Sequence, residues 1–406
     1  MNKHPFLRTS ILLSSLALGS VGCDSSDGST RGGDRSGIAV IHSARYESTL
    51  VSLLSSDGEL VQDDCINSGS QDVKLSLALS GDVVLPSSPQ REGELVLIDR
   101  ANDALLWMDP TNCRVKSQLS VGPGGTQMNP RDIVTVSADK AYVTRFNTLV
   151  AADGASTGGD VLVINPSAGA LGTRIDLSAQ AVSEGDAAIL PRPDALLLVD
   201  TQLFVSLGNQ TSAFDTTATG RVAIIDTTTD AVTGTLDIPE YRYCTGLSYV
   251  QDEQTLVVTC SGQYVDGVLD PTSSAMVLFD LSASPPVRKQ TLAASDFGGR
   301  GVSSATPVSA SRGFVTIPGE FGTTPTDAVW SYDAGAGTTS RVYEAADSFV
   351  LGNLFVLPGG KSGLLADATA EDPRIRVLNL EGSLAESRSF SSNPSANLPP
   401  RLLAAY

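Results

Sequence analysis

The chain of 406 residues has only two histidines, His4 and His42, and this scarcity restricts the chemistry open to it. Histidine is the usual base beside a nucleophilic serine or cysteine, and a common zinc ligand. His4 falls in an expected export signal, and a lone His42 in the apolar stretch AVIHSA is expected to be a hydrogen-bonded structural residue. Phosphate-loop and HExxH motifs are also absent from the sequence. We therefore predict no catalytic residue.

Positive charge is scarce as well. There are 27 Lys and Arg against 45 Asp and Glu, which gives a net charge of −18. Nucleic acids are held mainly by clustered basic side chains, so we exclude them as partners. A hydrophobic content of 41% with only 18% charged residues excludes a disordered chain. Long amphipathic helical stretches are nearly missing, whereas 38 Gly and 21 Pro favour an all-β fold with many turns.

A long apolar run occurs only near the N-terminus. Residues 11–18 follow Lys3 and Arg8, and about ten apolar residues are too few to span a bilayer, which needs about twenty. We therefore expect a cleavable export signal at residues 1–22. The sequence SVGC ending at Cys23 resembles a bacterial lipobox, which implies cleavage before Cys23 and a lipid on its thiol. An ordinary secretory signal with an incidental cysteine is the alternative.

Residues 23–36 follow this signal as an expected flexible tether, because the stretch after Cys23 holds no apolar side chain that could join a core. Four further cysteines agree with export, since an even number suits disulfides in an oxidising compartment. Cys244 and Cys260 are symmetric about Asp252, so a hairpin there would oppose them. By elimination, Cys65 is expected to pair with Cys113. No CxxC or CxxCH spacing indicates zinc or haem.

One unit recurs along the chain with a mean spacing of about 54 residues. Each unit has four expected strands, and the third ends in a short polar residue followed by a turn. The seven third-strand ends are Ser55, Asp109, Asn165, Asp226, Asp280, Asp333 and Asn379. Because a four-stranded sheet cannot bury both of its apolar faces alone, the units are expected to stack radially.

The two ends of the repeat region are offset from each other. The first unit begins at Ile38 with a run that matches a second strand, while the C-terminal PPRLLAAY resembles first-strand openings such as NPRDIVTV. We therefore predict that residues 37–406 form a seven-bladed β-propeller of four-stranded antiparallel blades, closed by the C-terminal strand. A β-helix or two stacked sandwiches is the alternative, but neither explains the offset.

The segment AYVTRFN at residues 141–147 and the following GGDVLVINPSAGALGTRIDL resemble the YVTN-type β-propeller repeat. GRVAIIDTTTDAVTGTLDI at residues 220–238 is similar to its second half, and the likeness covers most of residues 38–391. The resemblance implies a propeller. Because propellers of this type occur in surface proteins, lactonases and redox enzymes, it implies fold far more than function.

Long insertions are expected between the second and third strands at residues 147–159, 208–219, 261–273 and 318–327. Carboxylates are calcium ligands, and lactonase-like propellers hold a metal over the channel. The acids in these insertions are not spaced as a calcium loop, so we predict solvated loop acids, with no metal and no cofactor. The acids are Asp153, Asp215, Asp266, Asp270, Glu320 and Asp327.

Arginines gather at the starts of expected first strands and at the end of one second strand, positions that share one face of a propeller. Guanidinium groups bind carboxylates and phosphates well, so these residues are predicted to bind a small anionic ligand. In the alternative, each arginine pairs with an acid such as Asp132, Asp194 or Glu240. The predicted positions are Arg131, Arg145, Arg192, Arg242 and Arg300, with Arg401 at a similar place.

These observations predict a lipid-anchored, non-catalytic binding module of the bacterial cell envelope. Its expected partners are the membrane, through the N-terminal lipid, and an unknown protein or small anionic ligand. The alternative is an envelope enzyme, lactonase-like or metal-dependent, with its site on the face of the inserted loops.

Overall fold

The computed structural model describes residues 36–44, 46–91, 93–122, 126–150, 156–265, 268–320 and 324–406. The chain divides into two compact units, Met1–Gly33 and Asp34–Tyr406, and only the second is described below. The predicted signal, the lipidation site Cys23 and most of the tether lie outside the described residues. Within the described part, no helix is long and apolar enough to cross a membrane.

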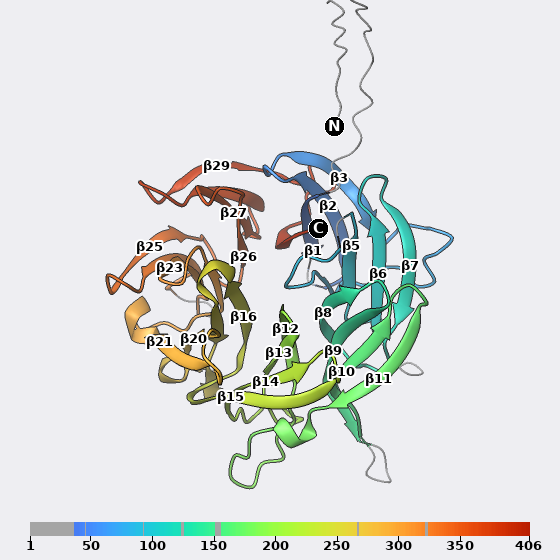
Figure 1. Ribbon diagram of the computed structural model, residues 1–406. Helices are drawn as coiled ribbons and strands as arrows, with labels where there is room; N and C mark the ends of the chain where they lie inside the picture. Colours follow the sequence, from blue (N-terminus) through green and yellow to red (C-terminus); the bar gives the residue numbers. More distant parts are fainter. Residues whose placement is uncertain are drawn as a thin grey trace, which may run out of the picture. The chain divides into compact units, whose positions relative to one another are not determined.

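The regular secondary structure of the described residues consists of β-strands and four short 3-10 helices, joined by turns and loops (Figure 1). The strands fall into four-stranded antiparallel groups, numbered 1 to 7 along the chain. Group 1 contains β30 (Pro400–Ala405), β1 (Gly37–Ala44), β2 (Ser48–Ser55) and β3 (Leu60–Asn67). Group 2 contains β4 (Val83–Val84), β5 (Leu95–Asp99), β6 (Ala104–Asp109) and β7 (Arg114–Ser120). Group 3 contains β8 (Pro130–Ser137), β9 (Lys140–Val150), β10 (Ser156–Asn165) and β11 (Ala170–Asp176).

The remaining groups have the same order. Groups 4 and 5 contain β12 (Pro193–Val199), β13 (Gln202–Leu207), β14 (Thr219–Asp226) and β15 (Ala231–Arg242); and β16 (Cys244–Val250), β17 (Thr255–Cys260), β20 (Ala275–Asp280) and β21 (Val287–Ala293). Groups 6 and 7 contain β22 (Ser304–Pro307), β23 (Arg312–Ile317), β24 (Ala328–Asp333) and β25 (Thr338–Glu344); and β26 (Leu351–Val356), β27 (Ser362–Asp367), β28 (Arg374–Asn379) and β29 (Glu386–Phe390).

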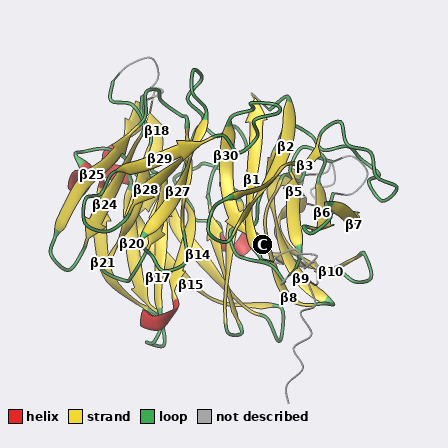
Figure 2. Ribbon diagram, turned by 90° about the horizontal axis from the view of Figure 1, so that it is seen from above, coloured by secondary structure: helices red, strands yellow, loops and turns green. Residues whose placement is uncertain are grey.

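Outside these groups lie one hairpin, β18 (Gln263–Val265) with β19 (Val268–Asp270), and the 3-10 helices η1 (Ser178–Gln180), η2 (Gln251–Glu253), η3 (Pro271–Ser273) and η4 (Ala294–Phe297). Groups 4 and 5 join in one eight-stranded sheet through the pair Leu207 and Cys244, while the other five groups are separate sheets in the described part. In Figure 2 the strands run between two loop-bearing faces.

All seven predicted third-strand ends coincide with the last residue of a strand in the structure. Side chains at these positions stabilise the turn that follows. Asp226 accepts a hydrogen bond from the backbone N–H of Thr228 at 2.8 Å, and Asp280 accepts one from Ser282 at 2.9 Å. Asp and Asn carboxyl and amide groups commonly stabilise turns in this way, which explains why the repeat ends can be located from sequence.

The inner strands are apolar on both faces because each sheet is covered on both sides. Every residue of β17 and β5 is buried, whereas the outer strand β11 is mostly exposed. One cluster packs group 2 on group 3, and the next packs group 3 on group 4. A further cluster combines Ile38 and Val40 of group 1 with Leu364 and Ile375 of group 7. Burial between successive sheets therefore supplies the core.

The C-terminal strand completes group 1, as the offset of the repeat predicts. β30 pairs antiparallel with β1, with Ile38 opposite Ala405 and Val40 opposite Leu403. The ends of the described unit are thus hydrogen-bonded to each other, and separating them would expose both β1 and the apolar side chains packed on group 7.

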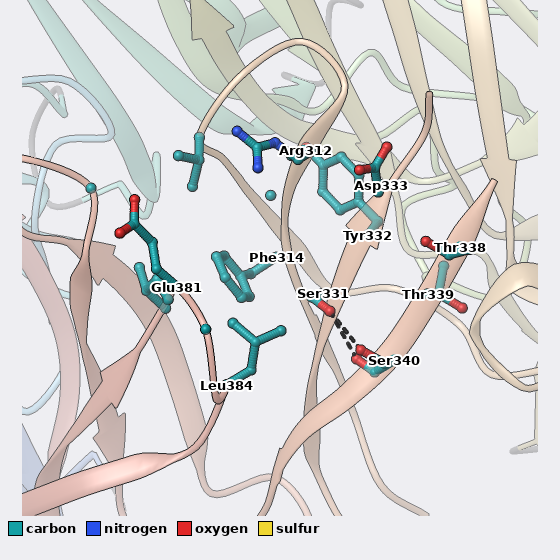
Figure 3. A pocket seen from close by; sticks show the side chains of 15 residues that line it. Arg312, Phe314, Ser331, Tyr332, Asp333, Thr338, Thr339, Ser340, Glu381 and Leu384 are labelled. Atoms are coloured by element: carbon teal, nitrogen blue, oxygen red, sulfur yellow. Dashed lines mark hydrogen bonds between the residues drawn. The ribbon is translucent and has the colours of Figure 1, made fainter. Parts of the chain in front are cut away.

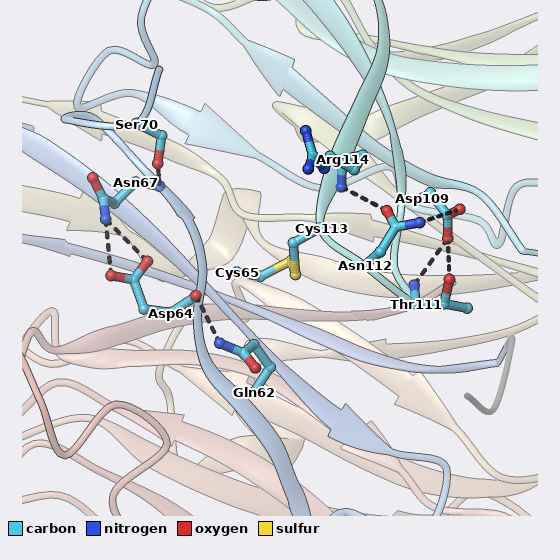
Figure 4. Close-up of a disulfide and its surroundings, with 10 residues drawn as sticks. All are labelled: Gln62, Asp64, Cys65, Asn67, Ser70, Asp109, Thr111, Asn112, Cys113 and Arg114. Carbon is cyan, nitrogen blue, oxygen red and sulfur yellow. Dashed lines mark hydrogen bonds between the residues drawn. A yellow bond between two sulfur atoms is a disulfide. The ribbon is translucent and has the colours of Figure 1, made fainter. Parts of the chain in front are cut away.

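Both predicted disulfides are present. Cys244 and Cys260 lie directly opposite each other on β16 and β17 and are bonded, in agreement with the hairpin register. Cys65 in β3 is bonded to Cys113, which immediately precedes β7, so this bridge links the outer edges of groups 1 and 2 (Figure 4).

Buried aspartates tie neighbouring groups together near the inner strands. Asp132 of β8 is 2% exposed, accepts a backbone hydrogen bond from Ser87 at 3.0 Å and another from Leu196 of β12 at 2.8 Å, and also accepts from the Ser87 hydroxyl. One carboxylate therefore connects groups 2, 3 and 4. Burial outweighs these hydrogen bonds and raises the pKa of Asp132 to about 6.

This pKa predicts a pH-dependent stability. The folded-state pKa of Asp132 lies above its ordinary value of 3.8. The protonated carboxyl group therefore contributes to the free energy of unfolding fully below about pH 4, and this contribution is lost as pH rises through about 6. The free energy of unfolding of the native protein should therefore fall by roughly 2.5 kcal/mol relative to that of the Asp132→Asn variant from pH 4 to pH 7. Denaturant unfolding at a series of pH values measures it, and a difference that stays constant would contradict the assignment.

Candidate functional site

The connections between second and third strands share one face of the unit, the inserted-loop face. In group 3 the connection extends the β9–β10 hairpin, in group 5 it contains β18, β19 and η3, and in groups 4 and 6 it is irregular. Four of the predicted arginines contact one of these connections or the strand leading into it, whereas Arg145 lies on such a strand and contacts Asp160 of β10. Arg192, for example, donates to the carbonyl of Thr211 at 3.1 Å, and Arg242 donates to that of Thr217.

Two of the arginines form an alternating stack with two phenylalanines. The Arg131 guanidinium carbon lies 4.3 Å from the Phe146 ring centroid, and Arg192 lies 5.2 Å from Phe146 and 4.3 Å from Phe214. The two rings are 6.4 Å apart and nearly parallel, so Arg192 is sandwiched between them. Cation–π contacts of this kind fix the position of a guanidinium without neutralising its charge.

The hydrogen-bonding capacity of these two arginines is only partly used. The Nε atoms of Arg131 and Arg192 are buried and have no hydrogen-bond partner in the described residues, and neither side chain forms an ion pair there. Arg192 is 4% exposed. Burial, together with the like charge of Arg131, lowers the pKa of Arg192. An anion at this point would supply the missing acceptor and offset the repulsion.

Asp194 and Tyr243 complete the electrostatic environment of the stack. Burial raises the pKa of Asp194, although the charges of Arg131 and Arg100 act in the opposite direction. Burial and the nearby Asp194 raise the pKa of Tyr243 to about 12, so its hydroxyl remains a hydrogen-bond donor at neutral pH. The cluster therefore combines positive charge, one carboxyl group and one phenol.

Two of the five predicted ligand-binding arginines are paired with acids, which is the arrangement that the alternative describes. Arg145 forms a two-pronged ion pair with Asp160, with both N···O distances 2.7 Å and both side chains nearly fully buried. Arg242 pairs with Glu184 at 3.1 Å. Both guanidiniums therefore have part of their charge neutralised by a carboxylate.

In the described residues, none of the three acids named in the alternative forms an ion pair with one of the five predicted arginines. Glu240 pairs with Arg288, and Asp132 accepts hydrogen bonds from Ser87 and Leu196. Asp194 forms no ion pair within 4 Å in the described residues, so Arg131, Arg192 and Arg300 remain without a carboxylate partner in that part of the chain.

Two contiguous cavities open beside the stack and share Tyr264 and Pro318. The first, the Tyr243 pocket, has a volume of about 300 Å³; its lining includes Phe214, Asp215, Tyr243, Gln263, Tyr264 and Pro318. The second, the Arg300 pocket, has about 260 Å³; its lining includes Tyr264, Val268, Leu269, Arg300, Pro318 and Phe349. Both are built largely from the insertions, as expected for a site on a rigid β-scaffold.

Sequence reasoning missed the aromatic part of this site. Phe214, Tyr243 and Tyr264 line the cavities, and Phe214 and Tyr264 are more than half exposed. Aromatic residues make up only 5% of the chain, so their occurrence in three of the four insertions, as Phe214, Tyr264 and Phe321, was a usable signal.

The acids of the insertions do not assemble into a metal site in the described residues. No group of three or more His, Cys, Asp or Glu side chains there could hold a metal ion. Asp215 accepts from the Thr211 hydroxyl at 2.6 Å, and Asp270 caps η3. Asp327 is buried and accepts four backbone hydrogen bonds. Glu320 borders the Arg300 pocket, while Asp153 and Asp266 lie outside the described residues.

His42 is fully buried and hydrogen-bonded, which is the structural role expected from its sequence context. Its Nε2 atom lies 2.8 Å from the Ser52 hydroxyl, and its Nδ1 atom lies 3.1 Å from the Leu398 carbonyl. Burial lowers the pKa of His42 to about 3. The imidazole is therefore neutral at physiological pH and joins β1 to the segment before β30.

A larger cavity of about 480 Å³ lies on the opposite face, between groups 6 and 7 (Figure 3). Its walls include Phe314, Leu380 and Leu384, with Arg312 and Glu381 also in the lining, and Ser331 and Ser340 are hydrogen-bonded at 2.9 Å. It is formed by turns within the groups rather than by the insertions, and no sequence pattern pointed to it.

No family model matches the chain, and no curated protein matches it. Among solved structures, it is similar to a "putative 6-phosphogluconolactonase" from Bacteroides uniformis, with 13% identity, coverage of 92% of this chain and 100% of that chain, and a TM-score of 0.59. A second "putative 6-phosphogluconolactonase", from Bacteroides fragilis, is 11% identical, with coverage of 93% of this chain and 99% of that chain and a TM-score of 0.55.

A "hypothetical selenium-binding protein" from Sulfolobus tokodaii is similar to the same extent, with 9% identity, 92% and 93% coverage, and a TM-score of 0.58. At such low identity these similarities concern the fold alone. The chain therefore has a propeller-like, all-β fold of antiparallel four-stranded units.

Proposed function

We propose that the protein is a closed, seven-bladed β-propeller that binds a small anionic ligand on its inserted-loop face without catalysing a reaction. We further propose that it is exported and held at the bacterial cell envelope by a lipid on Cys23. Closure is supported by the pairing of β30 with β1 and by the apolar cluster that packs group 7 on group 1.

The observation that carries the binding proposal is the state of Arg131 and Arg192. Both guanidiniums are positioned by Phe146, both have a buried Nε without an acceptor, and neither is neutralised by a carboxylate within ion-pair distance in the described residues. A buried donor without a partner costs free energy, which a bound oxyanion would recover. The adjoining Tyr243 pocket is lined by Phe214, the ring that stacks on Arg192, so it lies beside the stack.

Arg131→Gln is expected to weaken anion binding roughly tenfold, because it removes one charge-assisted hydrogen-bonding group. Arg131 stacks on Phe146 and makes no hydrogen bond in the described residues, but its charge compensates the buried Asp194, so the melting temperature of the variant without ligand is the reference for each titration. Thermal-shift titrations with inorganic phosphate, sulfate and citrate measure the effect, since a ligand raises the melting temperature by mass action.

Arg341→Gln is the matched control, because Arg341 is an exposed arginine of β25 paired only with Glu344. The loss of anion binding caused by Arg131→Gln should be larger at low salt than at high salt, since salt screens charge interactions. Equal anion binding by the Arg131 variant and the control, or no stabilisation of the native protein by any of the three anions, would refute the proposal.

A lactonase-like enzyme is the second candidate, because two similar structures are described as putative 6-phosphogluconolactonases. Hydrolysis of 6-phosphogluconolactone by the purified protein, followed by proton release, tests it directly. Hydrolysis that is lost on replacing Arg131 would favour the enzyme over the binding module.

The anchor is tested separately. Cys23→Ser should abolish incorporation of labelled fatty acid and move the protein from the membrane to the soluble fraction, because the thiol is the only lipid attachment point that the lipobox resemblance implies. Membrane fractionation measures this. Retention of the unlabelled variant in the membrane fraction would rule out lipid anchoring at this residue.

A further inference from the structure

The Arg300 pocket differs in chemistry from the arginine stack. Tyr264, Val268, Leu269, Pro271, Pro318 and Phe349 give it mainly apolar walls, and Arg300 supplies the positive charge in the lining. We propose that this pocket binds a small amphipathic monocarboxylate, a molecule with an apolar body and one terminal carboxylate. The proposal is independent of Arg131 and Arg192, which do not line this cavity.

Arg300 is held in place by backbone carbonyls rather than by an acid. Its Nη2 atom donates to the carbonyl of Pro318 at 2.7 Å and to that of Thr326 at 2.6 Å. Nε and Nη1 have no partner in the described residues, where Arg300 also forms no ion pair. Carbonyl contacts position the guanidinium and leave its full charge available, which is the arrangement that carboxylate recognition requires.

The acids around Arg300 determine how many charges the ligand can carry. The Asp327 carboxylate is occupied by four backbone N–H groups. Glu320 also lines the cavity. Burial lowers the pKa of Arg300, although the charges of Asp327, Glu344 and Glu320 favour its protonated form. Because Asp327, Glu344 and Glu320 already place negative charge around Arg300, the pocket should accept one carboxylate and disfavour dicarboxylates and phosphates.

The apolar walls indicate the other half of the ligand. Val268 is 69% exposed and Phe349 is 38% exposed, although both line the cavity. Val265 of the same hairpin is exposed as well. Apolar side chains that gather at one opening mark a binding surface, and an apolar ligand body would remove them from water. An inorganic anion would satisfy Arg300 and leave these side chains exposed.

Isothermal titration calorimetry of the purified protein with three probes tests both halves of the proposal. 4-Phenylbutyrate should bind, whereas 4-phenylbutyramide, which has the same body without the charge, should bind at least about tenfold more weakly. Acetate, which has the charge without the body, should also bind at least about tenfold more weakly. This comparison uses only the native chain, so it remains valid even if a variant fails to fold.

Variants then locate the site. Arg300→Gln should weaken 4-phenylbutyrate binding at least about tenfold, and Val268→Ser roughly threefold or more, because they remove the charge and part of the apolar wall. Val287→Ser, at an exposed valine of β21 that does not line the cavity, should leave binding unchanged. Equal affinity for the acid and the amide, no binding of 4-phenylbutyrate, or unchanged binding by the Arg300 variant would overturn the proposal.

Phosphate and sulfate separate this proposal from the proposed function. If these anions stabilise the native protein through Arg131 but 4-phenylbutyrate binds no better than acetate, the Arg300 proposal fails and the function stands. If 4-phenylbutyrate binds through Arg300 while phosphate, sulfate and citrate have no effect, the site at Arg131 fails and the amphipathic acid site stands.

Discussion

Replacing Asp327 by alanine is expected to lower the free energy of unfolding by roughly 4 kcal/mol or more, the largest loss that we predict for a single residue. Asp327 is 2% exposed and accepts backbone hydrogen bonds from Gly319 at 2.6 Å and from Phe349, Val350 and Leu351 at 2.8 Å each. Alanine would leave four N–H groups without this acceptor, at a cost of about 1–3 kcal/mol for each that stays buried.

The position of this carboxylate explains why the effect should be global. Asp327 immediately precedes β24 in group 6, and Leu351 is the first residue of β26, the inner strand of group 7. The Asp327 carboxylate therefore fixes the start of β26 in group 7 against the start of β24 in group 6. Guanidinium denaturation measures the loss, and Asp333→Ala is the control, since Asp333 accepts one backbone hydrogen bond, from Ala336, in an exposed turn. Similar losses for both variants would contradict this account.

Arg145→Met is expected to destabilise the protein by about 3–5 kcal/mol, because it leaves Asp160 buried with less compensation. The Asp160 side chain is fully buried, and Arg145 holds both of its oxygens while also donating to the carbonyl of Val121 at 3.1 Å. Arg174 is the other cation beside Asp160, and its side chain is 30% exposed, so it replaces only part of the lost interaction.

A double variant separates the buried charge from the packing around it. Arg145→Met combined with Asp160→Leu removes both charges and should recover most of the stability lost in the single variant, since apolar residues of similar volume often replace a buried pair at little cost. Denaturation midpoints of the native, single and double variants form the comparison. If the double variant is no more stable than the single one, the loss arises from packing and not from the unpaired carboxylate.

Sequence reasoning located the strands well because the signals are local. β17, with the sequence TLVVTC, is buried on both faces, and Asp226 and Asp280 close their strands with side-chain hydrogen bonds to residues two positions along. The pairing of Cys244 with Cys260 followed from the symmetry of one hairpin. These features depend on a few neighbouring residues, so periodicity and turn chemistry reveal them.

The candidate site was predicted less completely, because its residues come from different groups. Arg131, Arg192 and Arg300 remained without carboxylate partners in the described part, but Arg145 and Arg242 did not. Asp160 meets Arg145 because β9 and β10 place them directly opposite each other, and Glu184 reaches Arg242 from a connection 58 residues away. Neither encounter follows from local spacing.

The sequence by itself determined the repeat, the strand ends, the disulfide pairs and the completion of group 1 by the last strand, because each is encoded by alternation, turn residues or matching end segments. Only the tertiary structure decided which arginines keep an uncompensated charge and which apolar side chains gather beside Arg300. Those outcomes depend on the distances between insertions from different sheets, and a charge is neutralised by whatever lies within a few ångströms in space, not by its neighbours in the chain.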